Sequence, residues 1–330
     1  MAIYRLEAKI IGRKAKDKSG QPIPGKEVSV VAKAAYRSGE KLKDERIGRT
    51  FNYRARSQEV VHCEIVTPGG APDWMQSSRA RLWNAIEKAE KRVDSQLARE
   101  FTLALPVELT REEQIEAVRE WCRQEIVSKG FVADFAVHRS KDGRNPHAHI
   151  LATLRPVEGD GFGKKPDTAG KFNKRGSVGK ETKNELVAWR ESWAKAENAA
   201  LVQAGRKERV DHRSLKDQNI DRVPEPKIGV DAMAMKRRGI EADPERIRLV
   251  RHVRLENNIR SAIREVRKHG EVFQRRGAGR TWWERARLAI GRVREHAGEL
   301  LRSEASSWGA YMETRRGQEG EKGQEPQVSR

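Results

Sequence analysis

Apolar and polar residues alternate at the beginning of the chain. From Ala2 to Ile10, every second residue would lie on one face of an extended segment, as in a β-strand with one buried side. Similar apolar segments, separated by turns rich in Gly and Pro, predict further strands. These strands span Thr50–Arg56, Glu59–Val66, Leu97–Leu105 and Phe131–His138, and another begins at His147.

Between these segments, apolar residues recur every three or four positions, which is the period of an amphipathic helix. Ser29 is suited to cap a short helix over Val30–Ser38, which Gly39 would end. Thr110 and Glu113 form a capping box at the start of another helix. Further helices are predicted over 78–93 and from Thr182 to Gly205, and others start near Asp243 and Thr281.

The order of these elements predicts an α+β fold, with an antiparallel β-sheet covered by helices on one side. Residues 1–240 would form this domain, which a basic loop at about 155–181, rich in Gly and Lys, would interrupt. Residues 241–314 read as a basic helical C-terminal extension. Residues 315–330 have almost no apolar side chains, so we expect a disordered tail.

Charge indicates the kind of partner. The chain has 330 residues and a formal net charge of +20, which favours binding to a polyanion. No apolar stretch is long enough to span a bilayer, and the N-terminus is too polar for a signal peptide. Two cysteines exclude a disulfide framework and fit a reducing cytoplasm. We therefore expect a cytoplasmic protein without membrane insertion.

Three histidines form the most specific pattern in the sequence. His147 and His149 are separated by one small residue, so they would point to the same side of a strand. His138 ends the preceding strand, and the polar stretch between them is typical of a hairpin loop. Such a hairpin would place all three imidazoles together. Three imidazoles can hold a divalent metal and leave coordination positions open.

A metal site on a basic protein suggests phosphodiester chemistry, with either metal-activated water or a side chain as the nucleophile. Tyr36 lies on the short predicted helix between Lys33 and Arg37. The charges of these two residues would favour a phenolate and an incoming DNA phosphate. Tyr53, on a predicted strand among basic residues, stays an alternative nucleophile.

Two acidic residues could assist this site. Asp134 is four residues before His138 and would share its strand face, so it could orient a histidine. Glu100 opens the strand segment Phe101-Thr102-Leu103 and could act similarly. Both also fit the alternative of ordinary surface acids.

Several motifs together resemble one family, the MobA/MobL relaxases, which are plasmid mobilisation endonucleases of the HUH class with a single catalytic tyrosine. The order and spacing of the motifs agree with the family as well as their residue types. The resemblance covers about residues 1 to 240. It rests on Met1 to Leu6, Tyr36-Arg37-Ser38-Gly39, Phe101 to Leu109, Asn145 to Ile150, Arg190 to Ala194, Asn198 to Leu201 and Asp211 to Leu215.

The resemblance implies a mechanism. Tyr36 would attack a phosphate of single-stranded DNA at the nick site of an origin of transfer, leaving a 5′-phosphotyrosyl link and a free 3′-OH that can later rejoin the strand. His138, His147 and His149 would bind Mg²⁺ or Mn²⁺. Relaxosome accessory proteins, a coupling protein and a secretion system would be the partners, in a bacterial cytoplasm on plasmid DNA.

Other activities remain compatible with parts of the pattern. Members of the family often continue into a primase or helicase domain, but this chain has no phosphate-binding glycine loop with Lys-Ser/Thr. We therefore expect a host helicase to supply unwinding. A rolling-circle replication initiator or a single-tyrosine transposase would use the same chemistry. A non-enzymatic, basic DNA-binding accessory protein is the third alternative.

Overall fold

Five antiparallel strands form the central sheet. The computed structural model describes residues 3–16, 21–139, 143, 145–166, 180–226, 229, 235, 249–261 and 263–264. The strand order is β1 (Leu6–Gly12), β7 (Gln96–Ala104), β9 (His147–Thr153), β8 (Ala133–His138) and β6 (Val60–Val66). All neighbouring strands in the sheet are antiparallel. The predicted α+β class with an antiparallel sheet is therefore confirmed.

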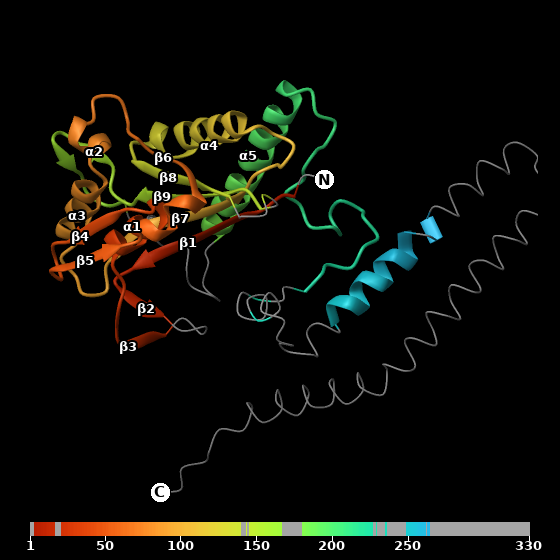
Figure 1. Ribbon diagram of the computed structural model, residues 1–330, viewed down its shortest axis with the longest axis horizontal. Coiled ribbons are helices and arrows are strands. Elements are labelled where there is room, and N and C mark those ends of the chain that lie inside the picture. Colours follow the sequence, from red (N-terminus) through yellow and green to blue (C-terminus); the bar gives the residue numbers. More distant parts are fainter. Residues whose placement is uncertain are drawn as a thin grey trace, which may run out of the picture. The chain divides into compact units, whose positions relative to one another are not determined.

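Helices cover both faces of this sheet (Figure 1). The helices α4 (Arg111–Glu125) and α5 (Lys180–Gln203) pack on one face, and α1 (Val30–Ser38), α2 (Asp73–Ser77) and α3 (Arg79–Ala89) pack on the other. Every residue of β8 is buried as a result. The expectation of helices on one side only was wrong, because the apolar period of a helix does not show which face of a sheet it will cover.

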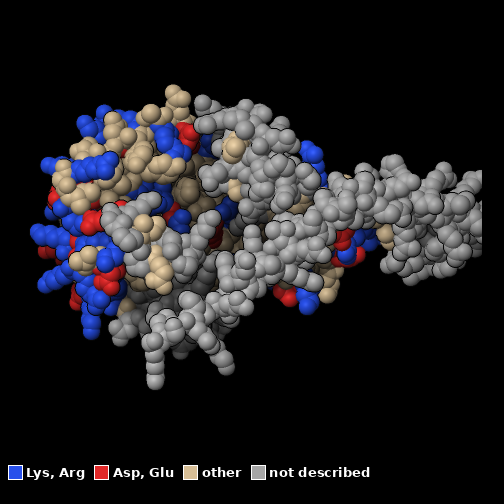
Figure 2. All heavy atoms as spheres, turned by 90° about the horizontal axis from the view of Figure 1, so that it is seen from below, with Lys and Arg blue, Asp and Glu red and all other residues tan. Residues whose placement is uncertain are grey.

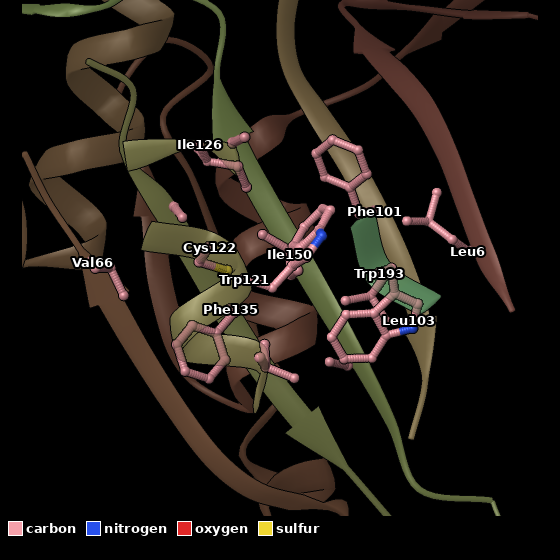
Figure 3. Packing of buried hydrophobic residues seen from close by; sticks show 14 of the residues in the cluster. Leu6, Val66, Phe101, Leu103, Trp121, Cys122, Ile126, Phe135, Ile150 and Trp193 are labelled. Carbon is pink, nitrogen blue, oxygen red and sulfur yellow. The ribbon is translucent and has the colours of Figure 1, made fainter. Parts of the chain in front are cut away.

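The core under α4 and α5 consists of large apolar side chains from the sheet and both helices (Figure 3). Phe101 of β7 makes edge-to-face contacts with Trp121 of α4 and Trp189 of α5, with ring centroids 5.3 and 5.0 Å apart. Phe101 is 1% exposed, and full burial of such a side chain stabilises the fold by roughly 1.5–3 kcal/mol. This packing holds β7, which lies between β1 and the central strand β9, against both helices.

The core on the opposite face holds α1 against the sheet. Val30, Val31, Ala34 and Ala35 are buried there. Ser29 caps the helix, since its hydroxyl accepts a hydrogen bond from the backbone N–H of Ala32. Gly39 ends the helix with a φ of 68°, a left-handed conformation that glycine adopts without a steric penalty. The predicted bounds of α1 are confirmed.

Small two-stranded sheets lie beside the central sheet. They pair β2 (Lys14–Lys16) with β3 (Pro22–Glu27), β4 (Lys41–Asp44) with β5 (Arg49–Asn52), and β10 (Val157–Glu158) with β11 (Gly161–Phe162). The predicted strand over Thr50–Arg56 is correct only in its first part, because the chain turns into a 3₁₀ helix over Arg54–Glu59. The predicted basic loop at about 155–181 is described only in part. The described residues are 155–166, which include the β10–β11 hairpin, and the first residues of α5.

The chain divides into two compact units, residues 1–212 and 213–330. In the second unit, residues 249–261 are helical, and the Asn257 side chain both donates to and accepts from the backbone of Val223, at 2.9 and 2.8 Å. The predicted helices beginning near Asp243 and Thr281 and the tail 315–330 fall mostly or wholly outside the described residues. The boundary at residue 240 stays a prediction.

Candidate metal and nucleophile site

The β8–β9 hairpin brings the three histidines together. His138 lies directly opposite His147, and Ala136 lies opposite His149. The centroids of the three imidazole rings are 5.1 to 5.5 Å apart. One ring nitrogen from each residue lies within 4.8 Å of the others, so a single ion could contact all three. The predicted convergence of these residues is confirmed.

Protein acceptors orient two of the rings. The Nε2 atom of His138 lies 2.6 Å from the carbonyl oxygen of Arg37, and the Nδ1 atom of His147 lies 2.9 Å from that of Asn145. A carbonyl oxygen can only accept, so these nitrogens carry hydrogen and the other nitrogen of each ring keeps its lone pair. Histidines that ligate metals use this arrangement. The Nδ1 atom of His149 is 3.3 Å from the hydroxyl of Thr102 on β7.

Burial keeps two of these imidazoles neutral. Desolvation lowers the pKa of His138 below its ordinary value of 6.5. The pKa of His149 falls to about 2, because of burial and the neighbouring charge of Arg37. Only the neutral imidazole ligates a metal, so the donor set fits a divalent cation at neutral pH.

Tyr36 stands next to this cluster on the last turn of α1. The adjacent residue, Arg37, supplies the carbonyl that binds His138. Tyr36 is 40% exposed, and its ring has two neighbours. The ring of Tyr53 meets it edge-to-face at 5.2 Å, and the guanidinium carbon of Arg56 lies 3.9 Å from its centroid. Tyr53 packs partly into the core beneath α1, which leaves Tyr36 as the more accessible of the two candidate nucleophiles.

Arg37 and Glu100 form a buried ion pair beside the histidines. Burial lowers the pKa of Arg37 to about 10, so its guanidinium stays charged at neutral pH. Glu100 also contacts Lys9 at 2.9 Å and lies 4.0 Å from Nδ1 of His149. Arg37 is 6% exposed. We therefore reassign it from the expected DNA contact to the positioning of the site, because its guanidinium is already paired inside the fold.

Asp134 does not touch a histidine. It shares the strand face of His138, as expected, but its carboxylate accepts from Nε of Arg79 at 2.9 Å and from the indole N–H of Trp83 at 2.8 Å. Arg79 also pairs with Glu40. The idea that Asp134 orients a histidine was wrong for this geometry, because α3 supplies both of its partners. Asp134 instead ties α3 to the sheet.

Three residues beside these groups were not anticipated from the sequence: Arg56, Thr102 and Arg79. Arg56 follows Tyr53 in a segment expected to be extended, and the 3₁₀ turn brings it over Tyr36. Thr102 reaches His149 because β7 and β9 pair in a register that places these residues opposite each other. Alternation along the strand Leu97–Leu105 could have indicated Thr102, because it is a polar residue between apolar ones.

The antiparallel sheet, covered by helices on both faces, thus carries three converging histidines that could hold a metal ion. Beside them lies Tyr36, an exposed candidate nucleophile. Residues 28–238 match the model of the MobA/MobL family. The chain belongs to the MobA/MobL family.

Similar proteins carry names from plasmid transfer. The chain is 36% identical over 267 residues to "Probable conjugal transfer protein TraA" of Sinorhizobium fredii, covering 74% of this chain and 24% of that protein. It is 30% identical over 340 residues to "Probable mobilization protein MobA" of Bifidobacterium longum, covering 93% of this chain and 56% of that protein. The chain thus spans about a quarter of the length of the TraA proteins that it matches.

A solved structure described as the molecular basis of vancomycin resistance transfer in Staphylococcus aureus has a related fold. It is 30% identical, with a TM-score of 0.52, and the match covers 64% of this chain and all of that chain. Among the described residues, no helix combines the length and apolar character needed to cross a bilayer.

Proposed function

We propose that this protein is a DNA relaxase for plasmid mobilisation, which nicks single-stranded DNA at an origin of transfer and later rejoins it. The observation that carries the proposal is the hydrogen bond between the Arg37 carbonyl and His138. This bond attaches the end of α1 to the histidine cluster, so an exposed tyrosine lies beside three histidines that could hold a metal ion. Membership of the MobA/MobL family supports the same activity.

The reaction is a transesterification. The phenolic oxygen of Tyr36 attacks the scissile phosphorus and loses its proton, while the bond from phosphorus to the 3′ oxygen breaks. The products are a 5′-phosphotyrosyl link and a 3′-OH, which takes up a proton. Because one phosphodiester replaces another, the 3′-OH can reverse the step. Mg²⁺ or Mn²⁺ bound to His138, His147 and His149 would polarise the phosphate and stabilise the developing charge.

The protein's own residues hold these groups in place. Arg56 lies against the ring of Tyr36, where its charge would stabilise a phenolate. The buried ion pair between Arg37 and Glu100 connects α1 to β7 beside the histidines. The hydroxyl of Thr102 orients the ring of His149. Lys33 remains the proposed phosphate contact. It lines the groove that also contains Tyr36. Burial, together with the nearby charges of Arg37 and Lys9, lowers the pKa of Lys33.

The setting follows from the activity. Lys and Arg side chains cover much of the described surface in Figure 2, as expected for a protein that binds DNA. We propose that it acts in the bacterial cytoplasm on plasmid DNA, with relaxosome accessory proteins, a host helicase, and a coupling protein that leads to a secretion system.

Covalent capture tests the proposal. The full chain is incubated with Mg²⁺ or Mn²⁺ and single-stranded oligonucleotides that tile the DNA flanking its own gene, labelled at either end. We expect a denaturant-resistant adduct on the 5′ end of one fragment, and a free 3′-OH on the other. Tyr36→Phe should abolish the adduct, while Tyr53→Phe should keep it. An adduct with Tyr36→Phe would reassign the nucleophile, and no adduct with any oligonucleotide would reject the relaxase.

A further inference from the structure

A groove of about 580 Å³ extends from Tyr36 between α1 and the β4–β5 hairpin. The hairpin lies beside α1 in Figure 1. One wall consists of α1 and the residues just before it, where the small side chains of Ser29 and Ala32 alternate with larger ones such as Lys33. The other wall is aromatic and basic. The lining residues that matter here are Ser29, Ala32, Lys33, Arg49, Phe51 and Tyr53.

The aromatic wall is regular because of the strand period. Arg49, Phe51 and Tyr53 occupy alternate positions of β5 and the residue that follows it, so their side chains project to one side. The guanidinium carbon of Arg49 lies 5.1 Å from the centroid of Phe51. The ring of Tyr53 meets the ring of Tyr36 at 5.2 Å. Cations and aromatic rings therefore line the groove as far as the candidate nucleophile.

We propose that this groove binds an unpaired nucleobase of the DNA strand next to the scissile phosphate, with the base stacked on Phe51. The inference rests on the proposed relaxase function and adds a nucleotide subsite to it. Aromatic rings interleaved with basic side chains are the usual means of binding single-stranded nucleic acid, because every base offers a flat π-surface. Arg49 is exposed, and its guanidinium lies over the ring of Phe51. The base would take this place on the ring, and the long side chain of Arg49 would turn to the phosphate of the stacked nucleotide.

Burial distinguishes this wall from ordinary core packing. Phe51 and Tyr53 pack against the core beneath α1 but keep part of their surface exposed. Trp83 and Met75 in the same core are fully buried. Ile47, at the turn of the hairpin, is 41% exposed and also lines the groove. The hairpin thus presents partly exposed apolar side chains in the groove that also contains Tyr36.

A second groove gives the strand a path beyond this subsite. It has a volume of about 780 Å³ and shares Val28 and Lys33 with the first. Its lining includes the exposed Lys14 and also Lys9 and Lys165, which pair with Glu100 and Glu90. A strand that passes Lys33 would therefore bring its next phosphate to Lys14, which would provide the electrostatic part of the binding.

A double-mutant cycle between protein and DNA tests the stacked base. The full chain carrying Tyr36→Phe, which cannot cleave, is titrated into the fluorescent oligonucleotide identified by covalent capture, and Kd is read from anisotropy. Each nucleotide around the nick is replaced in turn by an abasic site. At one position, we expect the abasic site to weaken binding by about 5- to 150-fold. In a Phe51→Leu background, the same abasic site should cost almost nothing, because the stacking partner is already gone.

Two further variants test whether the loss of coupling is caused by the missing ring at residue 51 and not by a general change in packing. Phe51→Trp should restore the penalty of the abasic site, since it restores a ring. Phe162→Leu is the matched control, because Phe162 also packs partly exposed beside an aromatic residue, Trp74, with ring centroids 6.3 Å apart, but does not line this groove. This variant should keep the full penalty.

The outcomes separate the two proposals. If the wild-type chain forms the covalent adduct but no abasic position couples to Phe51, the nucleobase subsite is rejected and the relaxase stands. Coupling that is equally strong with Phe162→Leu would also overturn it. If no oligonucleotide is captured covalently, the relaxase is rejected; the same titration with single-stranded DNA of mixed sequence then tests the groove, and equal Kd values for the wild-type chain and Phe51→Leu reject it.

Discussion

At the scale of single residues, the histidine cluster makes the sharpest claim. His147→Ala removes one of the three proposed ligands, so the affinity for Mn²⁺ should fall. The loss should exceed the roughly 10- to 100-fold decrease that follows removal of a residue that only orients a ligand. Isothermal titration calorimetry measures it. His62→Ala is the matched control, because His62 lies on β6 of the same sheet and pairs with Glu64 at 2.9 Å. Equal Mn²⁺ affinities for His147→Ala and the wild-type chain would contradict the metal site.

A buried carboxyl group far from this chemistry carries a second prediction. Glu197 of α5 is 0% exposed, and neither carboxyl oxygen has a hydrogen-bond partner among the described residues. Desolvation raises its pKa from 4.5 to about 9. Between these two pH values, the unfolded chain gives up the proton that the folded chain keeps, so stability falls as the pH rises through this window.

Glu197→Met should therefore stabilise the protein at pH 7 by about 1–3 kcal/mol, the usual cost of a buried polar group without a partner. Its advantage over the wild-type chain should grow from pH 5 to pH 9. Urea unfolding at pH 5, 7 and 9 measures both effects. Glu197→Gln is the control, since it removes the titration but keeps a polar group. The idea is wrong if the wild-type chain and Glu197→Met show the same pH dependence.

At the scale of elements, the end of α1 affects both the stability of the fold and the geometry around Tyr36. Gly39 has a φ of 68°, and a Cβ added there would lie 2.9 Å from the Cα atom of Ser57. Ser57 belongs to the 3₁₀ turn that carries Arg56. Gly39→Ala should therefore destabilise the protein by more than the roughly 1–2 kcal/mol of a left-handed residue. It should also slow nicking in the molecules that remain folded.

Gly48→Ala separates these two effects. Gly48 has the same φ of 68°, but an added Cβ would meet nothing within 4 Å. This variant should lose only the backbone contribution and keep the nicking rate of the wild-type chain. Chemical unfolding and single-turnover nicking of both variants provide the comparison. Equal losses in both measurements would show that the contact with the 3₁₀ turn is unimportant.

The elements also show what the sequence can predict. Local signals predicted α1 with its Ser29 and Gly39 caps, the capping box of α4, and the β8–β9 hairpin, because each depends on residues close together in the chain. The β4–β5 hairpin and the 3₁₀ turn after it were missed, since Thr50–Arg56 contains enough apolar residues to resemble one strand. Asp134 was misassigned for a different reason. Its partners, Arg79 and Trp83, come from a helix more than fifty residues earlier.

At the scale of the whole molecule, charge extends beyond the site. The net charge of +20 is shared between the family-matched region, residues 28–238, and the rest of the chain. Every proposed catalytic and metal-binding residue lies before residue 150. The segment beyond residue 240 is rich in arginine. Its histidines and carboxylates form no sequence pattern as specific as that of His138, His147 and His149. We therefore expect it to contribute affinity rather than chemistry.

Removing residues 241–330 should leave nicking of a single-stranded oligonucleotide intact but weaken retention on longer DNA. Binding to phosphates releases counterions, so the slope of log K against log salt should become shallower by about 0.7–0.9 for every phosphate that the truncated chain no longer neutralises. Binding measured across a salt series checks this. The cut also removes Asn257, which bonds the backbone of Val223, so full-length Asn257→Ala serves as the control and should keep the wild-type slope. An unchanged slope for the truncated chain, together with failure to bind a protein partner, would assign these residues to protein contacts instead.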